Sequence, residues 1–230
     1  MVLYSYLKKL SVIFLLALSI PVWAADPRIG ILIYDGVLTS DVTAPAEVFG
    51  VASRQAWFKD YPVAFISVED KDTITTEEGL VLTPAYSIVN APSLDVLILP
   101  SSYNMDWLFK NKKLTDFIQQ QSKSASWMAS NCSGAFLLAN AGLLNGKRAT
   151  TWAGGEKDLQ RAYPQIKVIE DQNMVIDGNI LTSNGSLVSY QAALVLLAKM
   201  SSISRAKEVF DTLQMSRVTA WSDIEKFLED

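Results

Sequence analysis

The chain has 230 residues, a net charge of −4 and a hydrophobic fraction of one half, with one cysteine (Cys132) and no histidine. These counts exclude an intramolecular disulfide, a Cys–His dyad, a Ser–His–Asp triad and a histidine-based metal site. The mildly acidic balance gives no electrostatic reason to expect direct nucleic-acid binding, and we expect neither a metal nor another cofactor.

Residues 1–24 have the pattern of a secretory signal peptide. Lys8 and Lys9 form a basic start, an apolar run follows, and Ala24 closes a small-residue cleavage site. The apolar run is too short for a comfortable membrane span, so we expect no stable membrane anchor after cleavage. Residues 25–230 are then one domain, exported across the inner membrane and predicted to reside in the bacterial periplasm.

Strands alternate with helices along this domain. Continuous apolar runs at residues 28–34 and 95–100 are typical of strands buried on both faces of a parallel sheet. Further strands are expected at 62–68, 127–129 and 168–169, with hairpins at 74–83 and 174–183. Helices are expected over 44–55, 114–122, 134–141, 156–162, 186–200, 204–214 and 222–228. This order predicts an α/β domain with a mostly parallel central sheet.

Cys132 stands in a tight turn between the strand at 127–129 and a helix rich in small residues. Ser130 and Gly134 flank it two positions away on either side, as a crowded strand-to-helix turn requires. Such a nucleophile elbow lifts the reactive atom above the sheet and over a helix N-terminus, where a thiolate is favoured. The alternative interpretation is that Cys132 is a small buried hydrophobic residue.

Three segments resemble the ThiJ/PfpI superfamily, also called class I glutamine amidotransferase-like proteins. They are Asp41-Val-Thr-Ala-Pro-Ala-Glu47-Val-Phe49, the run from Cys132 to Thr151, and Asp177-Gly-Asn-Ile-Leu-Thr-Ser-Asn-Gly185. The chain looks most similar to the branch of isonitrile hydratases and the N-terminal domains of AraC-type regulators. The resemblance implies a flavodoxin-like three-layer sandwich that forms a homodimer and binds a small-molecule ligand or substrate.

The sequence departs from that branch at two places. Trp152 stands where the branch usually has a histidine beside the cysteine, and Pro100-Ser101-Ser102 replaces its Pro-Gly-Gly. The resemblance therefore carries over a cysteine but no histidine base, which disfavours amidase or protease chemistry of the Cys–His kind. We expect Trp152 to wall the pocket and narrow it.

The resemblance also implies which groups surround the sulfur. It places the carboxyl of Glu47 against Cys132, where a protonated acid would hydrogen-bond the thiolate and stabilise it. Asp41 is a second candidate catalytic carboxylate, to orient water or substrate, or else a helix N-cap. For Glu47 alone, the alternative is a favourable interaction with the helix dipole.

Backbone N–H groups near the elbow are expected to form an oxyanion pocket. The candidates are those of Ser133 and of Ser101 or Ser102.

Three functions remain open. In the first, Cys132 is the nucleophile of a hydratase or lyase that acts on small electrophiles. In the second, Cys132 is a stress-responsive thiol that is reversibly oxidised. The third is a non-catalytic small-molecule-binding module similar to the sensor domain of AraC-type regulators.

Overall fold

The computed structural model describes residues 29–55, 57–58 and 61–228, so the expected signal peptide at residues 1–24 lies outside the described residues. Within them, a seven-stranded sheet forms the centre of the fold. Its strands, in spatial order, are β10 (Met174–Asp177), β11 (Ile180–Ser183), β7 (Trp127–Asn131), β6 (Val96–Leu99), β1 (Ile29–Ile33), β2 (Val63–Ser67) and β5 (Tyr86–Ser87). Neighbouring strands are parallel except β10 and β11, which pair in antiparallel fashion.

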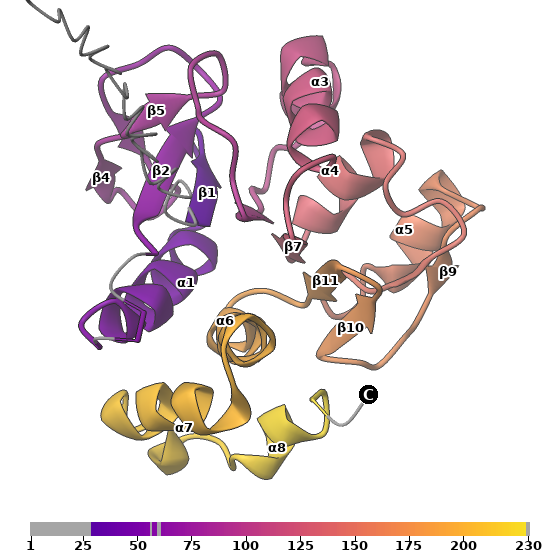
Figure 1. Ribbon diagram of the computed structural model, residues 1–230. Helices are drawn as coiled ribbons and strands as arrows, with labels where there is room; N and C mark the ends of the chain where they lie inside the picture. The colour runs from indigo at the N-terminus through magenta and orange to yellow at the C-terminus, as the bar shows by residue number, and fades with distance from the viewer. Residues whose placement is uncertain (1–28, 56, 59–60, 229–230) are drawn as a thin grey trace, which may run out of the picture.

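Helices cover both faces of this sheet. They are α1 (Thr39–Ala52), α2 (Asp106–Phe109), α3 (Lys112–Gln121), α4 (Gly134–Asn140), α5 (Glu156–Ala162), α6 (Val188–Met200), α7 (Ile203–Thr212) and α8 (Ser222–Glu225). Helices α1, α6 and α7 lie on one side and α3 and α4 on the other (Figure 1). None of the helices in the described ranges has the length and hydrophobicity needed to cross a bilayer.

The predicted α/β fold with a mostly parallel sheet is confirmed, and so are most expected elements. Every residue of β1 and β6 is buried, as their continuous apolar sequences predict. Both expected hairpins form: β10 pairs with β11, and β3 (Ile74–Thr75) pairs with β4 (Val81–Leu82). A small parallel pair, β8 (Arg148–Ala149) with β9 (Lys167–Val168), and the short elements β5 and α2 complete the fold.

One helix begins earlier than its sequence predicts. The first helix was expected to begin at Ala44, but α1 begins at Thr39. The cause is a partner distant in sequence: the carboxylate of Glu78 accepts a hydrogen bond from the Thr39 N–H at 2.9 Å. Because Glu78 satisfies an N–H that would otherwise be unpaired, the helix extends by more than a turn. Asp41 consequently lies inside the first turn and is not the N-cap residue.

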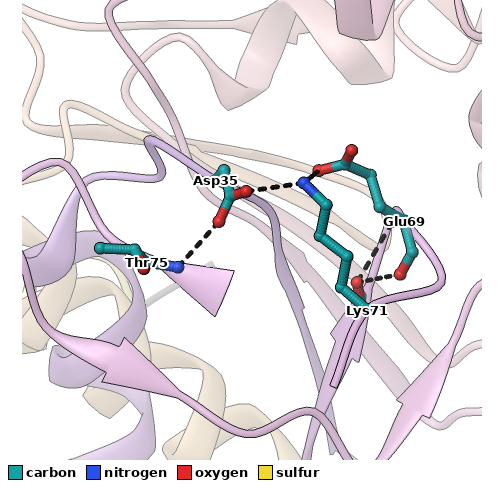
Figure 2. Close-up of polar contacts among 5 residues, drawn as sticks. Asp35, Glu69, Lys71 and Thr75 are labelled. Atoms are coloured by element: carbon teal, nitrogen blue, oxygen red, sulfur yellow. Dashed lines mark hydrogen bonds and ion pairs between the residues drawn. The ribbon is translucent and has the colours of Figure 1, made fainter. Parts of the chain in front are cut away.

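A second polar cluster holds the hairpin of β3 and β4 beside the end of β1. Lys71 Nζ lies 2.7 Å from Asp35 Oδ2 and 3.0 Å from Glu69 Oε2, and Asp35 Oδ1 accepts from the Thr75 N–H at 2.8 Å (Figure 2). These exposed ion pairs contribute modest stability. These contacts fix the position of the hairpin, and the same hairpin carries Glu78 to the start of α1.

Candidate functional site

Cys132 occupies the predicted elbow. It follows β7 directly and precedes α4, and its φ of 51° places it in the left-handed region that residues with a side chain rarely adopt. The Cys132 N–H donates to the Ser183 carbonyl at 2.9 Å, which fixes the turn against β11. A Cβ at Gly134 would lie 2.0 Å from the carbonyl oxygen of Leu99, so only glycine fits there. The crowding that the sequence predicts is therefore present.

The elbow opens into a cavity of about 630 Å³. Four of the expected site residues line it: Cys132, Ser133, Ser102 and Trp152. The remaining lining residues are Leu38, Tyr103, Met105, Asp106, Phe109, Phe136, Asn184 and Ser186. This volume lies within the range of small-ligand sites. Among the described residues, the lining is mostly apolar and carries one carboxylate, Asp106, and no basic side chain.

Trp152 forms part of an aromatic wall, as expected. Its ring stacks on that of Phe136, with centroids 5.5 Å apart and planes at 24°, and Phe109 follows at 6.2 Å from Phe136. A Cβ at Gly155 would lie 2.0 Å from the indole. The indole therefore lies directly on the backbone of Gly155, and the glycine is what allows it to do so.

Asp41 is the carboxylate nearest to the elbow. It is fully buried, and its Oδ1 accepts hydrogen bonds from the Ser186 N–H at 2.9 Å and the Ser189 hydroxyl at 3.0 Å. Its Oδ2 accepts from the Ser101 N–H at 3.2 Å and from the Ser101 hydroxyl. Burial raises the pKa of Asp41, and these four donors oppose that rise.

Ser101 connects this carboxylate to the sulfur. Its hydroxyl donates to Asp41 and also lies beside Cys132, where a hydrogen bond from it favours the thiolate and lowers the pKa of Cys132. A hydroxyl has one proton to give and oxygen lone pairs to receive another. The Ser101 proton therefore serves the Asp41 carboxylate or a Cys132 thiolate, one at a time, so Ser101 can relay a proton between the two.

The surroundings of Cys132 favour the neutral thiol, whereas the sequence predicts a stabilised thiolate. Burial raises the pKa of Cys132, and the negative charge of Asp41 raises it further. Hydrogen bonds from the Ser101 hydroxyl and the Ser133 N–H act in the opposite direction and are outweighed. Cys132 is therefore mainly a neutral thiol near neutral pH, and nucleophilic attack by it requires a base.

Glu47 does not lie against the sulfur, so the contact expected from the resemblance is wrong. Its exposed carboxylate accepts a hydrogen bond from the Tyr190 hydroxyl at 2.6 Å and lines a separate pocket. Glu47 lies six positions after Asp41, and at 3.6 residues per turn this offset points the two side chains to different faces of α1. Since the helix begins at Thr39, Asp41 is the carboxylate aimed at the elbow.

Of the N–H groups expected to form the oxyanion pocket, that of Ser101 is engaged elsewhere and that of Ser133 is in place. The Ser101 N–H is engaged by Asp41, and the Ser133 N–H is directed to the sulfur of Cys132. Ser102 lines the cavity, and its carbonyl accepts from the Ser133 hydroxyl at 3.3 Å. The N–H of Ser133 beside the sulfur is thus the donor placed to meet negative charge that develops near Cys132.

Several residues of the site were not predicted. Ser186 and Ser189 hold Asp41 from the start of α6, and Phe136 carries the aromatic wall. Phe136 lies in the first turn of α4, directly after the elbow. The serines gave no comparable signal, because their contact with Asp41 depends on the packing of α1 on α6. No cluster that could hold a metal occurs among the residues that the structure describes.

The profile of the DJ-1/PfpI family matches residues 27–199, which is most of the chain. The chain belongs to the DJ-1/PfpI family. It is 32% identical over 184 residues to isonitrile hydratase of Pseudomonas putida, covering 79% of this chain and 75% of that protein.

Two further relatives describe the same branch of the DJ-1/PfpI family. The chain is 24% identical to the HTH-type transcriptional regulator GbdR of Pseudomonas aeruginosa, over 79% of this chain and 49% of the regulator. The crystal structure of a ThiJ/PfpI family protein from Pseudomonas syringae superposes with a TM-score of 0.72 at 22% identity, covering 86% and 77% of the two chains. This superposition confirms the flavodoxin-like sandwich.

Proposed function

We propose that this protein is a cysteine-dependent enzyme that adds water to small, neutral electrophiles of the isonitrile or carbonyl type. The observation that carries the proposal is the position of the Ser101 hydroxyl between the Asp41 carboxylate and Cys132, which lines an aromatic cavity. The likeness to isonitrile hydratase supports the same reaction class.

In the proposed hydration of an isonitrile, the sulfur of Cys132 forms a bond to the terminal carbon. The thiol proton passes to the Ser101 hydroxyl, whose own proton passes to Asp41, so the carboxylate serves as base without touching the sulfur. The nitrogen and carbon of the substrate take up protons as the adduct forms and water attacks. Cleavage of the carbon–sulfur bond then releases a formamide and restores the thiol, so one water is consumed and no oxidant is needed.

The absence of histidine fits this chemistry. Addition and elimination at an unsaturated carbon need one group that takes and returns a proton, and a buried carboxylate of raised pKa suits that role. The aromatic wall of Phe136 and Trp152 favours substrates with a bulky apolar group. The absence of basic residues in the lining disfavours anionic substrates.

Turnover on a panel of alkyl and aryl isonitriles and aldehydes tests the proposal, with the formamide or adduct followed by mass spectrometry. Cys132→Ser and Asp41→Asn should abolish product formation, whereas Glu47→Gln should retain it. Turnover that persists in Cys132→Ser contradicts a cysteine mechanism. Loss of turnover in Glu47→Gln with retention in Asp41→Asn contradicts the assignment of the base.

The alternative function is non-catalytic binding of a small molecule in the same cavity. The raised pKa of Cys132 favours it, because a protonated thiol is a poor nucleophile, and the likeness to part of GbdR is in keeping with a sensor-type domain. Saturable binding of panel compounds without turnover, unchanged in Cys132→Ser, would select this alternative.

A response to oxidants is a third possibility, in which Cys132 gains oxygen reversibly under mild peroxide. Mass spectrometry of the peroxide-treated protein separates this role from hydration. A stress-response function would require such a gain at low peroxide concentration.

The proposal extends to location and assembly. We place the mature protein, residues 25–230, in the bacterial periplasm as a homodimer, on the pattern of residues 1–24 and on the family resemblance. Fractionation of cells and determination of the mature N-terminus test the location, and light scattering tests the assembly.

A further inference from the structure

A second cavity, of about 470 Å³, lies at the opposite end of the central sheet from Cys132. Trp127, the first residue of β7, lines it, whereas Cys132 follows the last residue of the same strand. At about 3.3 Å per residue, the two lie on the order of 15 Å apart along the strand. Lys199, near the end of α6, also lines the second cavity, while Ser189 at the start of α6 binds Asp41. The two cavities are therefore separate sites.

Three cationic side chains from three different elements converge on this second cavity. Arg148 comes from β8, Lys199 from α6, and Lys226 from the segment after α8. None of the described residues that line the cavity is acidic. Such a concentration of positive charge is unexpected in a chain whose net charge is −4.

Two carboxylates among the described residues lie beside these cations. Asp177 lies 3.9 Å from Arg148 Nε but also 3.7 Å from Lys147 Nζ, so it is shared between two cations. Asp95 lines an adjacent pocket together with Lys199.

Contacts within the chain orient two of the cations. The guanidinium of Arg148 donates to the Ile176 carbonyl at 3.0 Å, which fixes its position at the rim. Lys226 Nζ lies 5.1 Å from the ring centroid of Phe227.

The rest of the lining is apolar and partly aromatic. Trp127, Phe227 and Met174 contribute large hydrophobic surfaces beside the cationic groups. A ligand that matches both features has an apolar ring to cover these surfaces and an anionic group to meet the cations.

We propose that this basic and aromatic cavity binds a small organic anion that carries an apolar ring. The anionic group lies between Arg148 and Lys226, and the ring lies on Trp127 and Phe227. Arg148 supplies directed N–H donors to a carboxylate, sulfonate or phosphate, and the lysines supply point charges. The proposal is independent of the chemistry at Cys132, because no residue is shared between the two cavities.

Calorimetric titration of the purified protein with 2-naphthoate, its neutral analogue 2-naphthamide and inorganic phosphate tests this site. The dissociation constant of naphthoate should be at least about tenfold lower than that of the amide, because naphthoate makes a charge-assisted hydrogen bond that the amide lacks. Binding should weaken as salt is added. Phosphate, which lacks the ring, should bind more weakly than naphthoate.

Variants locate the binding. Arg148→Gln combined with Lys226→Gln should weaken naphthoate binding about tenfold or more, since both charges are removed. The matched control, Lys112→Gln with Arg161→Gln, removes two exposed cations that pair with Asp116 and Asp158, and should leave the affinity unchanged. Lys226→Gln alone, outside any helix or strand, gives the same direction of change if the double variant is unstable.

Four results would overturn the proposal. They are equal affinity for naphthoate and naphthamide, equal affinity for phosphate and naphthoate, full affinity in the Arg148 and Lys226 variants, and loss of binding in Trp152→Ala. The last would place the anion in the Cys132 cavity instead.

Discussion

Asp41 and Cys132 lie on two sides of one small space beside Gly185. A Cβ at that glycine would come within 2.5 Å of Cys132 Cβ and 2.8 Å of Asp41 Oδ1. The φ of Gly185 is +80°, so this position needs glycine for two reasons: the left-handed backbone conformation and the lack of space for a Cβ. The carboxylate and the elbow can approach each other only because this position is glycine.

Gly185→Ala should therefore destabilise the fold and separate the two groups. We expect a loss of about 1–2 kcal/mol from the positive φ and about 1–3 kcal/mol more from crowding, measured by urea unfolding. Gly79→Ala is the matched control, because its φ is +87° and a Cβ there meets nothing within 4 Å. Equal losses in the two variants would contradict the crowding at the site.

The sequence predicts this fold well because the signals are local. The apolar runs of β1 and β6 and the Asp177-Gly178 turn each determine their own element. The sequence predicts less well which carboxylate lies beside Cys132. The start of α1 depends on Glu78, which lies 39 residues from Thr39 in sequence. A helix beginning at Ala44 leaves Asp41 outside it, whereas one beginning at Thr39 turns Asp41 to the elbow and Glu47 to solvent.

The pH dependence of Cys132 alkylation should report its raised pKa. Because the thiolate is the reactive form, the rate should keep rising at pH values above those at which an ordinary thiol has reached its plateau. Iodoacetamide labelling followed across pH measures the midpoint. A midpoint below that of free cysteine would contradict the neutral buried thiol and restore the stabilised thiolate.

Two neighbours of the sulfur should shift that midpoint in opposite directions. Asp41→Asn removes a negative charge that raises the pKa of Cys132, so the midpoint should fall. Ser101→Ala removes a hydrogen bond that lowers it, so the midpoint should rise. Glu47→Gln serves as the control and should leave the midpoint in place, because its carboxylate lies elsewhere. A shift of the same sign in the first two variants contradicts the proposed relay.

The titration of the Tyr190 phenol should report its contact with Glu47. The hydrogen bond to Glu47, burial and the negative charge raise the pKa of the Tyr190 phenol to about 12. In Glu47→Gln the charge disappears, and this pKa should fall toward its ordinary value of 10.0. Phenolate absorbance measures the change as a difference titration, and Tyr190→Phe assigns the signal. An unchanged curve would place the Glu47 carboxylate away from Tyr190.

Gly155→Ala should act on the cavity through Trp152 alone. The φ of Gly155 is −97°, which alanine adopts without strain, yet a Cβ there would lie 2.0 Å from the indole. The ring must therefore move from its stack on Phe136, and the cavity must change shape.

We expect Gly155→Ala to weaken binding of bulky aromatic compounds to the Cys132 cavity more than binding of small aliphatic ones. Trp152→Ala, which removes the ring itself, should change the selectivity in the same direction. Titration of both variants with paired aryl and alkyl isonitriles measures the effect, and Cys132→Ser prevents turnover during the measurement. Equal losses for the two compounds would show that the indole does not contact the ligand, since a general loss of packing lowers both affinities alike.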